Sequence, residues 1–487
     1  MKVLFVSSEI APLAKSGGLA DVAGSLPPAL AARGAQVVMA MPLYGVVDRQ
    51  AHNLEHAGLS YEVWACGGWG RRIDVWRARL GGCDCYLLEH NDLFDRPDLY
   101  GPPGGAYGDN LLRFVVFNKA VIELCRALNF APDIVHANDW QTALLPAYIK
   151  SRPFDLGPIW SAATVLTVHN MAYQGVYGRE MFGQTELPAD MDSVGGAEYW
   201  GNISLLKAGL VCADAITTVS PSYAWEIQTP EGGHGMDGVL HARRDVLRGI
   251  LNGADYDQWS PEKDRYLPAN YSAQDLTGKR ICRDKLLEAF GLEPAGERTA
   301  VIGFLGRLTH QKGVDFIAEM AWRLMDQDVR LCLFGTGDQH LEGMLWRLGQ
   351  EHAGRIGVRL AFQEDLAHLL TAGCDILLMP SRYEPCGLSQ LYAMRYGTAP
   401  LVRATGGLKD TVEPFEPDGH GSGVGFVFHD ADAHSLWSAV RHALWVFGQP
   451  DQWRILQQNA MARDFSWNQS ARQYLELYEQ TMARRGR

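Results

Sequence analysis

Residues 379–402, MPSRYEPCGLSQLYAMRYGTAPLV, decide the fold that we expect for this chain. An apolar run at Ile376–Met379 ends at Pro380, and charged and small residues follow it. A helical pattern begins near Leu388, and a second apolar run occupies residues 399–402. Strand, polar turn, helix and strand in this order predict a parallel β-α-β unit. Its turn lies at the carboxyl end of a strand, where α/β proteins bind ligands.

Glu384 lies in this turn, shortly before the predicted start of the helix. A carboxylate at that place can hold a sugar hydroxyl. The free N–H groups at the start of the helix can hold an anion, helped by the helix dipole. The turn therefore predicts a site for a ligand that carries both hydroxyl and anionic groups.

Composition sets the class of protein. A chain of 487 residues is long enough for two domains, and 47% hydrophobic residues argue against disorder. The formal net charge of −12 disfavours binding to nucleic acid or to an anionic membrane. No apolar run approaches the ~20 residues that span a bilayer, and the first residues do not form a secretory signal. Nine scattered cysteines fit a reducing compartment, so we expect a cytoplasmic protein.

Cys83 and Cys85 form a lone C-x-C pair without a second pair to complete a metal site. We interpret them as two half-buried thiols on a strand. The sequence predicts no metal ion.

The first half of the chain repeats the order strand, turn, helix. Strands are predicted at residues 2–7, 36–40, 134–137, 165–168 and 215–219, with antiparallel strands within 61–88. Helices are predicted at residues 19–32, 111–128 and 200–213, a long loop at 91–110 and a second loop at 231–238. An N-G pair at residues 252–253 interrupts the alternation of predicted strands and helices. We place the linker between the domains at 249–255.

Three polar turns follow predicted strands of this half. The first holds Lys15, Gly17 and Gly18, the second holds Asp139 and the third holds His169. The carboxyl ends of parallel strands share one edge of a sheet, so these turns should line one edge. Lys15 and the glycine turn can cradle a phosphate, although a plain tight turn explains the glycines equally well. For His169, a core histidine at a strand end remains an equal alternative.

The second half has its own alternation. Strands are predicted at residues 300–305, 329–334, 358–362, 376–379, 399–402 and 424–428. Helices are predicted to start near residue 314 and to span 388–396, 432–447, 451–463 and 467–482, with Asp432 as an N-cap. Arg307 and Lys312 stand five residues apart across a turn, where they can hold a diphosphate or remain two solvated surface cations. The last helix has Tyr474, Leu475, Leu477 and Tyr478 to bury and is expected to return to the first domain.

An ordered set of motifs identifies the chain as similar to the bacterial glycogen (starch) synthases. The motifs are KSGGLADV at 15–22, DRPDLYG at 95–101, HANDW at 136–140, TVHNMAYQG at 167–175, SLLKAGL at 204–210, GILNG at 249–253, GRLTHQKG at 306–313 and the opening stretch. Each motif alone can arise by chance, whereas the ordered set covers nearly the whole chain.

The resemblance implies a GT-B fold, in which two doubly wound Rossmann-like α/β domains face each other across a deep cleft. Residues 1–248 would form the acceptor-side domain, joined by the helix at 466–487. Residues 249–465 would bind the nucleotide sugar. The implied reaction moves glucose from ADP-glucose to the non-reducing end of an α-1,4-glucan, such as glycogen or a maltooligosaccharide, with retention of configuration. It needs neither a metal nor another cofactor.

The resemblance also assigns the site residues. Glu384 would stabilise positive charge at the anomeric carbon, with His169 close to that carbon. Lys15, Arg307 and Lys312 would hold the donor diphosphate. The remaining implied contacts comprise the phosphate turns (Gly17, Gly18, Cys386, Gly387, Leu388, Ser389), the sugar pocket (Asp139, Asn170, Asn252), a ribose or acceptor contact (Asp21) and an aromatic stacked on the base (Phe362).

Two positions depart from related patterns. Ala20 stands where many members have glycine, and its methyl group is expected to affect the acceptor side. Tyr392 stands where related retaining enzymes carry a second glutamate, and it also fits the glycogen synthase pattern. Three alternatives remain: a GT-B enzyme that uses UDP-glucose, one that makes maltose 1-phosphate or sucrose, and an inactive glucan-binding homologue. The last is disfavoured because Lys15, Arg307, Lys312 and Glu384 are all present, and a phosphorylase is disfavoured because no lysine motif for pyridoxal is recognisable.

Overall fold

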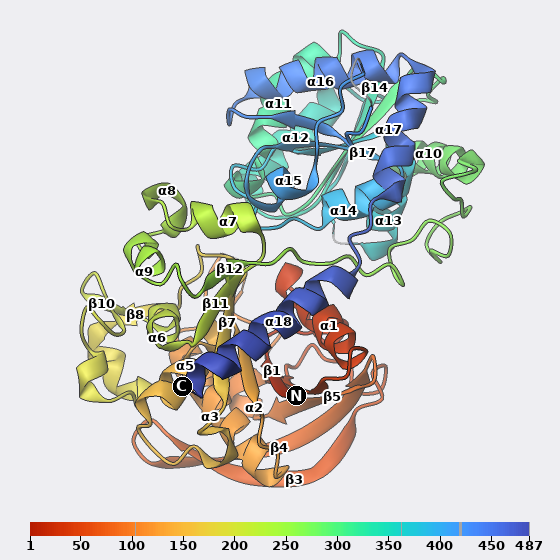
Figure 1. Ribbon diagram of the computed structural model, residues 1–487. Coiled ribbons are helices and arrows are strands. Elements are labelled where there is room, and N and C mark those ends of the chain that lie inside the picture. Colours follow the sequence, from red (N-terminus) through yellow and green to blue (C-terminus); the bar gives the residue numbers. More distant parts are fainter. Residues whose placement is uncertain (103, 362, 418–420, 487) are drawn as a thin grey trace. The chain divides into compact units, whose positions relative to one another are not determined.

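The computed structural model describes residues 1–102, 104–361, 363–417 and 421–486 (Figure 1). The chain forms two compact units, the first made of Met1–Gly253 with Trp467–Arg487 and the second of Ala254–Ser466. The boundary falls five residues after the predicted one at 248/249, and the chain returns to the first unit at 467 instead of 466. The later boundary has a structural cause, because the strand Leu247–Gly249 (β12) still pairs with the sheet of the first unit.

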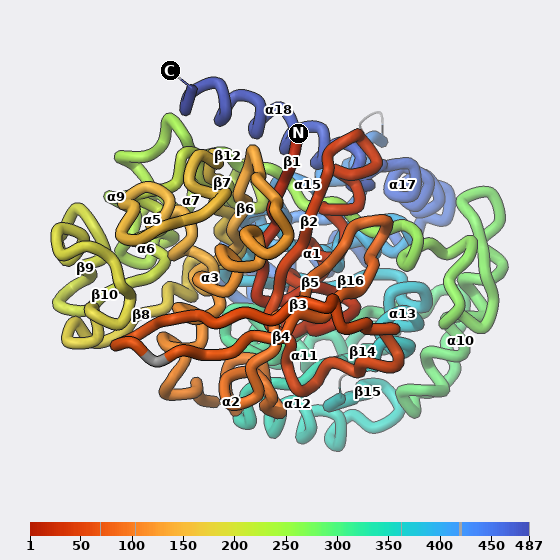
Figure 2. Tube along the Cα trace, turned by 90° about the horizontal axis from the view of Figure 1, so that it is seen from below, coloured from red at the N-terminus to blue at the C-terminus, as the bar shows by residue number. Residues whose placement is uncertain are grey.

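A nine-stranded sheet forms the centre of the first unit, in the order β12-β11-β7-β6-β1-β2-β5-β4-β3. Neighbouring strands from β12 to β5 run parallel, while β3 and β4 form an antiparallel hairpin along one edge, seen in Figure 2. The chain leaves β1 toward β2 on one side and reaches β6 on the other, so the switch point of the sheet lies between β1 and β6. The other bounds are β1 (Lys2–Val6), β2 (Gln36–Pro42), β3 (Glu55–Ala65), β4 (Trp69–Leu80), β5 (Cys83–Glu89), β6 (Ile134–Asn138), β7 (Ala163–Val168) and β11 (Ala215–Thr218).

Helices and a small sheet complete the first unit. The helices are α1 (Gly18–Ala31), α2 (Asn91–Phe94), α3 (Asn110–Ala127), α4 (Asp139–Thr142), α5 (Leu144–Ser151), α6 (Leu205–Cys212), α7 (Pro221–Glu226), α8 (Pro230–Gly233), α9 (Asp237–Ala242) and α18 (Trp467–Arg485). The small sheet has the order β8-β10-β9, with β8 at Val176–Gly178, β9 at Glu198–Tyr199 and β10 at Asn202–Ser204.

Several predicted elements of this unit were wrong in detail. The helix predicted at 200–213 begins only at Leu205, where the Ser204 hydroxyl accepts a hydrogen bond from Lys207 N, and the β9–β10 hairpin precedes it. The loop predicted at 231–238 contains parts of α8 and α9, and the loop predicted at 91–110 opens with α2. Cys83 and Cys85 lie on β5 as predicted, but both are buried rather than half-buried.

The carboxy-terminal helix α18 belongs to the first unit, as predicted, and lies beside α1 and β7 (Figure 1). Tyr474, Leu477 and Tyr478 are buried, whereas Leu475 is only partly so. The Tyr478 hydroxyl lies 2.6 Å from Nδ1 of His136, whose Nε2 is 2.6 Å from the Thr167 hydroxyl. His136 is thus a core histidine that fastens α18 to the sheet.

The second unit holds a parallel six-stranded sheet in the order β15-β14-β13-β16-β17-β18. Its switch point lies between β13 and β16. Alternate residues of each strand face opposite layers: Val301 and Cys332 pack in one core cluster, Ile302 and Leu331 in the other. The strands are β13 (Ala300–Leu305), β14 (Val329–Phe334), β15 (Ile356–Arg359), β16 (Ile376–Met379), β17 (Ala399–Arg403) and β18 (Phe426–Phe428).

Eight helices accompany this sheet in the described part of the unit. They are α10 (Thr277–Phe290), α11 (Val314–Leu324), α12 (Gln339–Glu351), α13 (Glu364–Gly373), α14 (Ser389–Arg395), α15 (Gly406–Thr411), α16 (Ala433–Phe447) and α17 (Pro450–Ala462). The predicted N-cap is confirmed, because Oδ1 of Asp432 accepts a hydrogen bond from Ser435 N at 2.7 Å. Across the described residues of both units, no helix combines the length and the apolar character that a membrane crossing requires.

Candidate active site

Asp139 and His169 meet at the carboxyl edge of the first sheet, after β6 and β7. Oδ1 of Asp139 accepts a hydrogen bond from the backbone N–H of His169 at 2.7 Å. Asp139 has φ = 55°, a left-handed conformation that is costly for a residue other than glycine and is typical of functional sites. Both side chains are buried. The prediction that these two turns lie together is confirmed.

Burial sets the charge of both groups. It raises the pKa of the Asp139 carboxyl to about 7, opposed by the hydrogen bond from His169 N and reinforced by the nearby charge of Glu9. Burial lowers the pKa of His169 to about 3. His169 is therefore neutral near pH 7, while Asp139 is poised between its two states.

Asn138, which the sequence analysis did not single out, sets the tautomer of His169. Its Nδ2 donates to the carbonyl of Val6 at 3.0 Å, which leaves Oδ1 as the acceptor 2.9 Å from Nε2 of His169. An amide oxygen accepts and cannot donate, so Nε2 of His169 carries the proton. Asn138 is the last residue of β6. A polar residue at the carboxyl end of a predicted strand is the signal that pointed to Asp139, and the same signal could have pointed to Asn138.

Glu9 organises the glycine turn and was also missed. Its carboxylate accepts hydrogen bonds from Ser16 N at 2.5 Å, the Ser16 hydroxyl at 2.6 Å, Gly17 N at 3.3 Å and the Tyr100 hydroxyl at 2.6 Å. The Tyr100 hydroxyl is also 2.8 Å from the hydroxyl of Ser8. Two N–H groups of the turn that was predicted to cradle a phosphate are thus engaged by a buried carboxylate.

Lys15, beside this turn, is paired with Asp21 in the first turn of α1. Its Nζ lies 2.7 Å from Oδ1 of Asp21, and the two side chains are 43% and 27% exposed. The pair is accessible enough to open, and an exposed pair of this kind is worth at most about 1 kcal/mol. Gly18 is the first residue of α1, and Gly17, its N-cap, has open space on its Cβ side. Ala20 is fully buried in α1, so its methyl group packs inside the unit.

Asn170 and Asn252 differ in their surroundings. Asn170 is partly exposed, and its Oδ1 accepts a hydrogen bond from Ala172 N at 3.0 Å. Asn252 is buried, and its Oδ1 has no hydrogen-bond partner among the described residues. A buried amide oxygen without a partner is costly, and a ligand hydroxyl would satisfy it.

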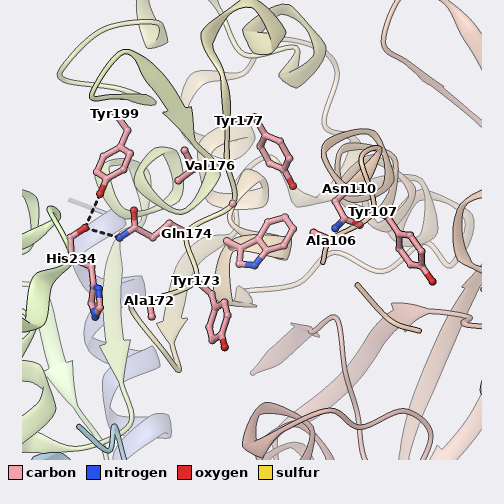
Figure 3. Close-up of a pocket in the computed structure, with 12 residues that line it drawn as sticks. Ala106, Tyr107, Asn110, Ala172, Tyr173, Gln174, Val176, Tyr177, Tyr199 and His234 are labelled. Carbon is pink, nitrogen blue, oxygen red and sulfur yellow. Dashed lines mark hydrogen bonds between the residues drawn. The ribbon is translucent and has the colours of Figure 1, made fainter. Parts of the chain in front are cut away.

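An aromatic pocket of ≈ 530 Å³ opens in the first unit (Figure 3). Residues 172–177, shortly after His169, line the pocket, and so does Trp140, the residue after Asp139. Five large aromatic side chains line it: Tyr107, Trp140, Tyr173, Tyr177 and Tyr199. The carbonyl of His234 closes one side by accepting hydrogen bonds from Gln174 Nε2 at 2.9 Å and the Tyr199 hydroxyl at 2.7 Å.

In the second unit, Glu384 and Lys312 come together at the switch point of the sheet. Nζ of Lys312 lies 2.6 Å from Oε2 of Glu384, and the Ser381 hydroxyl donates to the same oxygen at 2.8 Å. The side chains of Lys312 and Glu384 are 21% and 8% exposed. Lys312 is therefore not a solvated surface cation. The prediction assigned Lys312 to a phosphate and Glu384 to a sugar, and it did not foresee that the two are paired.

Close backbone packing holds the turn of Glu384 in place. The N–H of Gly407 donates to the carbonyl of Glu384 at 3.1 Å, and a Cβ at Gly406 would lie 2.0 Å from that carbonyl oxygen. The glycine pair after β17 thus allows α15 to approach the turn. On the other side, Arg382 binds both carboxylate oxygens of Asp315 on α11, at 2.8 and 2.6 Å.

The other residues predicted for the second unit include both exposed and buried positions. Arg307 is exposed after β13, Cys386 is buried, and Gly387 has φ = 70°. Leu388 is the N-cap of α14 and Ser389 its first residue, so the helix starts one residue later than predicted. Tyr392 stacks on Trp259 with ring centroids 4.1 Å apart, which makes it a packing residue. Phe362 lies outside the described residues. No cluster of metal-ligating side chains occurs in the part of the chain that the structure describes.

Comparison with known proteins decides the family. The model of the starch synthase catalytic domain matches residues 2–242, and the model of glycosyl transferases group 1 matches residues 289–445. A glycogen synthase of Anaeromyxobacter sp. (strain Fw109-5) is 44% identical over 99% of this chain and 100% of its own length. This chain belongs to the glycogen synthase family. Glycogen synthases of Geotalea uraniireducens and Myxococcus xanthus are 42% and 43% identical and are also covered over their full length.

Solved structures of relatives agree with this family. The catalytic domain of starch synthase IV from Arabidopsis thaliana, bound to ADP and acarbose, matches with a TM-score of 0.92 and 31% identity over 99% of both chains. A sucrose-phosphate synthase from Thermosynechococcus elongatus, at 20% identity and a TM-score of 0.60, shares the fold alone. The predicted GT-B fold and glycosyltransferase class are confirmed, as is the glycogen synthase resemblance.

Proposed function

We propose that this member of the glycogen synthase family transfers glucose from ADP-glucose to the non-reducing end of an α-1,4-glucan with retention of configuration. The full-length match to several glycogen synthases is the observation that carries the proposal. The relative of known structure that was solved with ADP and acarbose supports the choice of an adenine nucleotide and a glucan. Glycogen or a maltooligosaccharide is the proposed acceptor.

The proposed role of the cations follows from the leaving group. When ADP departs, negative charge grows on the phosphate oxygens, and fixed positive charge lowers the energy of that state. Lys15, Arg307 and Lys312 supply this charge in the proposal. The N–H groups at the start of α14, at Leu388 and Ser389, add a partial positive charge in the proposal. Asp21 is proposed to lie near the ribose or the acceptor, and Phe362 to stack on the base.

The proposed role of the second group of residues follows from the sugar. The anomeric carbon gains positive charge as its bond to phosphate breaks, so a carboxylate such as Glu384 stabilises it. His169 is proposed to lie close to this carbon, where its low pKa has a purpose. A neutral imidazole adds no positive charge beside the developing cation, whereas an imidazolium would repel it. Asp139, Asn170 and Asn252 are proposed to bind the hydroxyl groups of the glucose.

The aromatic pocket supports an acceptor of the glucan type. The faces of glucose rings carry C–H groups that pack on aromatic rings, while hydroxyl groups at the ring edges require hydrogen bonds. The pocket offers five aromatic side chains and polar groups such as the amide of Asn110. Its lining residue Trp140 directly follows Asp139 in the chain, and the lining segment 172–177 begins three residues after His169. Asp139 and His169 are proposed to contact the donor glucose.

We propose a front-face mechanism for the transfer. The departing phosphate oxygen takes the proton of the acceptor hydroxyl while that hydroxyl attacks the anomeric carbon on the same face. No protein nucleophile is needed, and a covalent glucosyl adduct on Glu384 or Asp139 would contradict this step. The proposal assigns no step to a metal ion, because lysine and arginine side chains supply the positive charge. Unchanged activity in EDTA is the expected result.

A direct assay tests the proposed donor and acceptor. Glucose incorporation into glycogen is measured from ADP-glucose and from UDP-glucose side by side, with glucose 1-phosphate as an alternative acceptor. The proposal predicts transfer from ADP-glucose to glycogen and none to glucose 1-phosphate. Preference for UDP-glucose, or formation of maltose 1-phosphate, would support the other GT-B activities instead. We further propose that the reaction takes place in the cytoplasm, which agrees with nine cysteines that are all free.

A further inference from the structure

The hairpin between β9 and β10 displays an exposed tryptophan on a strained turn. Tyr199 pairs with Asn202, so Trp200 and Gly201 form a two-residue loop. Both have positive φ, 50° for Trp200 and 81° for Gly201, as a type I′ turn requires. Asparagine followed by glycine is the favoured pair in such a turn, because asparagine tolerates the left-handed conformation and large side chains do not. Trp200 thus occupies a position that its backbone disfavours.

The indole does not offset this strain by burial. Trp200 is 80% exposed, so most of its apolar surface remains in water. Large exposed apolar groups that cost conformational energy are typical of binding surfaces. The backbone strain and the exposed ring are two separate observations on the same residue.

Trp200 lies beside the aromatic pocket. Its neighbour Tyr199 lines the pocket and donates its hydroxyl to the carbonyl of His234 at 2.7 Å (Figure 3). Gly235 follows directly. A Cβ built there would lie 2.7 Å from the Tyr199 hydroxyl and 3.2 Å from Nε1 of Trp200. The indole therefore packs on the same turn that closes the pocket and continues its aromatic lining outward.

The base of the hairpin is firmly anchored. Nζ of the buried Lys207 donates to the carbonyl of Val194 at 2.8 Å and also to the carbonyl of Glu198. Oε1 of Glu198 accepts a hydrogen bond from the N–H of Gly201 at 2.8 Å. Anchoring on both sides of Trp200 fixes the backbone that carries the ring, so less entropy is lost when a ligand packs on it.

We propose that Trp200 is a sugar-stacking residue that extends glucan binding beyond the pocket and selects long α-glucans over short ones. The inference rests on the proposed function, because it takes the pocket to hold the acceptor. A short acceptor fills the pocket alone. A longer chain places a further glucose ring on the indole, whose flat face packs against the C–H groups of the sugar.

Substitution by asparagine separates this role from folding. Trp200→Asn removes the ring and installs the residue that the turn favours, so its Tm is expected to equal or exceed that of the wild type. The ratio of kcat/KM for maltoheptaose to kcat/KM for maltotriose is expected to fall by about threefold to tenfold, as for the loss of one aromatic contact. Trp200→Tyr keeps an aromatic face and is expected to keep most of the ratio.

Trp160→Ala is the matched control. Trp160 is another exposed tryptophan of the same unit, 54% exposed, and it precedes β7, at the opposite edge of the sheet from the pocket. This variant is expected to keep the wild-type ratio. An unchanged ratio in Trp200→Asn, or an equal fall in Trp200→Tyr, would overturn the proposal.

A binding measurement distinguishes this inference from the proposed function. Mobility in native gels that contain glycogen reports glucan affinity without any transfer. Trp200→Asn is expected to be retarded less than Trp160→Ala, and equal retardation would overturn the role of Trp200. If the wild-type protein transferred no glucose to either acceptor, the proposed function would fail, while the gel measurement would still decide on Trp200.

Discussion

Lys312 and Glu384, 72 residues apart in the chain, form an ion pair with Nζ 2.6 Å from Oε2. Ser381 donates to the same carboxylate oxygen, so two donors converge on one atom. A largely buried carboxylate is costly unless it is paired in this way. The geometry joins the proposed phosphate ligand and the proposed sugar ligand in one contact, so a change at either residue affects the other.

Lys312→Met tests this coupling. The substitution keeps the length of the side chain but leaves Glu384 without its cation, and the free energy of unfolding is expected to fall by about 2 kcal/mol. Urea denaturation of the variant measures it. Lys285→Met is the control, since Lys285 is half exposed and pairs with Glu288 on the surface of α10, a contact worth less than about 1 kcal/mol. Equal free energies of unfolding for the two variants would show that the Lys312–Glu384 pair stabilises the fold no more than the surface pair does.

Glu9→Met tests the support of the glycine turn. Methionine has a similar length but accepts no strong hydrogen bond, so Ser16 N, Gly17 N and the Tyr100 hydroxyl lose their acceptor. Hydrogen exchange at the amides of Ser16 and Gly17 is expected to accelerate by at least about tenfold, which corresponds to ~1.4 kcal/mol.

The control for this experiment is Glu55→Met, on the exposed edge strand β3, where the carboxylate forms a surface pair with Arg77. Exchange at residues 16 and 17 should remain unchanged in the control. Slow exchange at both amides in Glu9→Met would contradict the role assigned to Glu9.

Asp139→Asn has a pH-dependent effect on stability. Burial raises the pKa of Asp139 to about 7 in the folded chain, against 3.8 for an aspartate exposed to water. The folded state therefore holds this proton more tightly than the unfolded state. The resulting stabilisation is complete below pH 3.8 and is lost as the pH rises through about 7. Asparagine is neutral at every pH and can still accept the hydrogen bond from His169 N.

Between pH 4 and pH 8, the wild type is expected to lose unfolding free energy relative to Asp139→Asn as the pH rises. The loss is on the order of 3 kcal/mol. Burial lowers the pKa of both His136 and His169 to about 3, which weakens the fold below pH 6.5. This effect acts on both proteins and largely cancels in the difference. A difference that is constant with pH would contradict the raised pKa.

The sequence predicted elements best where buried parallel strands give continuous apolar runs. The strand Ile376–Met379 matches the prediction. The neighbouring strand β17 was predicted at 399–402 and ends one residue later, at Arg403. The helix predicted at 200–213 begins only at Leu205, because residues 200 and 201 form a hairpin turn that lacks the usual Asn-Gly pair. No local sequence pattern reveals the positive φ angles of this turn or the hydrogen bonds from Lys207 to the carbonyls of Val194 and Glu198.

The candidate site was predicted in part for a related reason. Asp139, His169 and Glu384 each come shortly after the end of a parallel strand. Such positions can be recognised in the sequence, because ligands bind at the carboxyl ends of parallel strands. The partners of these residues cannot be predicted in the same way. The pairing of Lys312 with Glu384 depends on the order of β13 and β16 in the sheet, and the contacts of Glu9 depend on how residues 10–17 return to it.

In the proposed function, Glu384 supports glucose transfer from ADP-glucose at the carboxyl edge of the second sheet. The most direct test measures transfer of labelled glucose from ADP-glucose to glycogen by the wild type and by Glu384→Ala, with ADP binding followed by calorimetry. We predict rapid transfer by the wild type, a fall in kcat of at least about 10²-fold in the variant and persistent ADP binding. Transfer by Glu384→Ala at a rate close to that of the wild type would contradict the account.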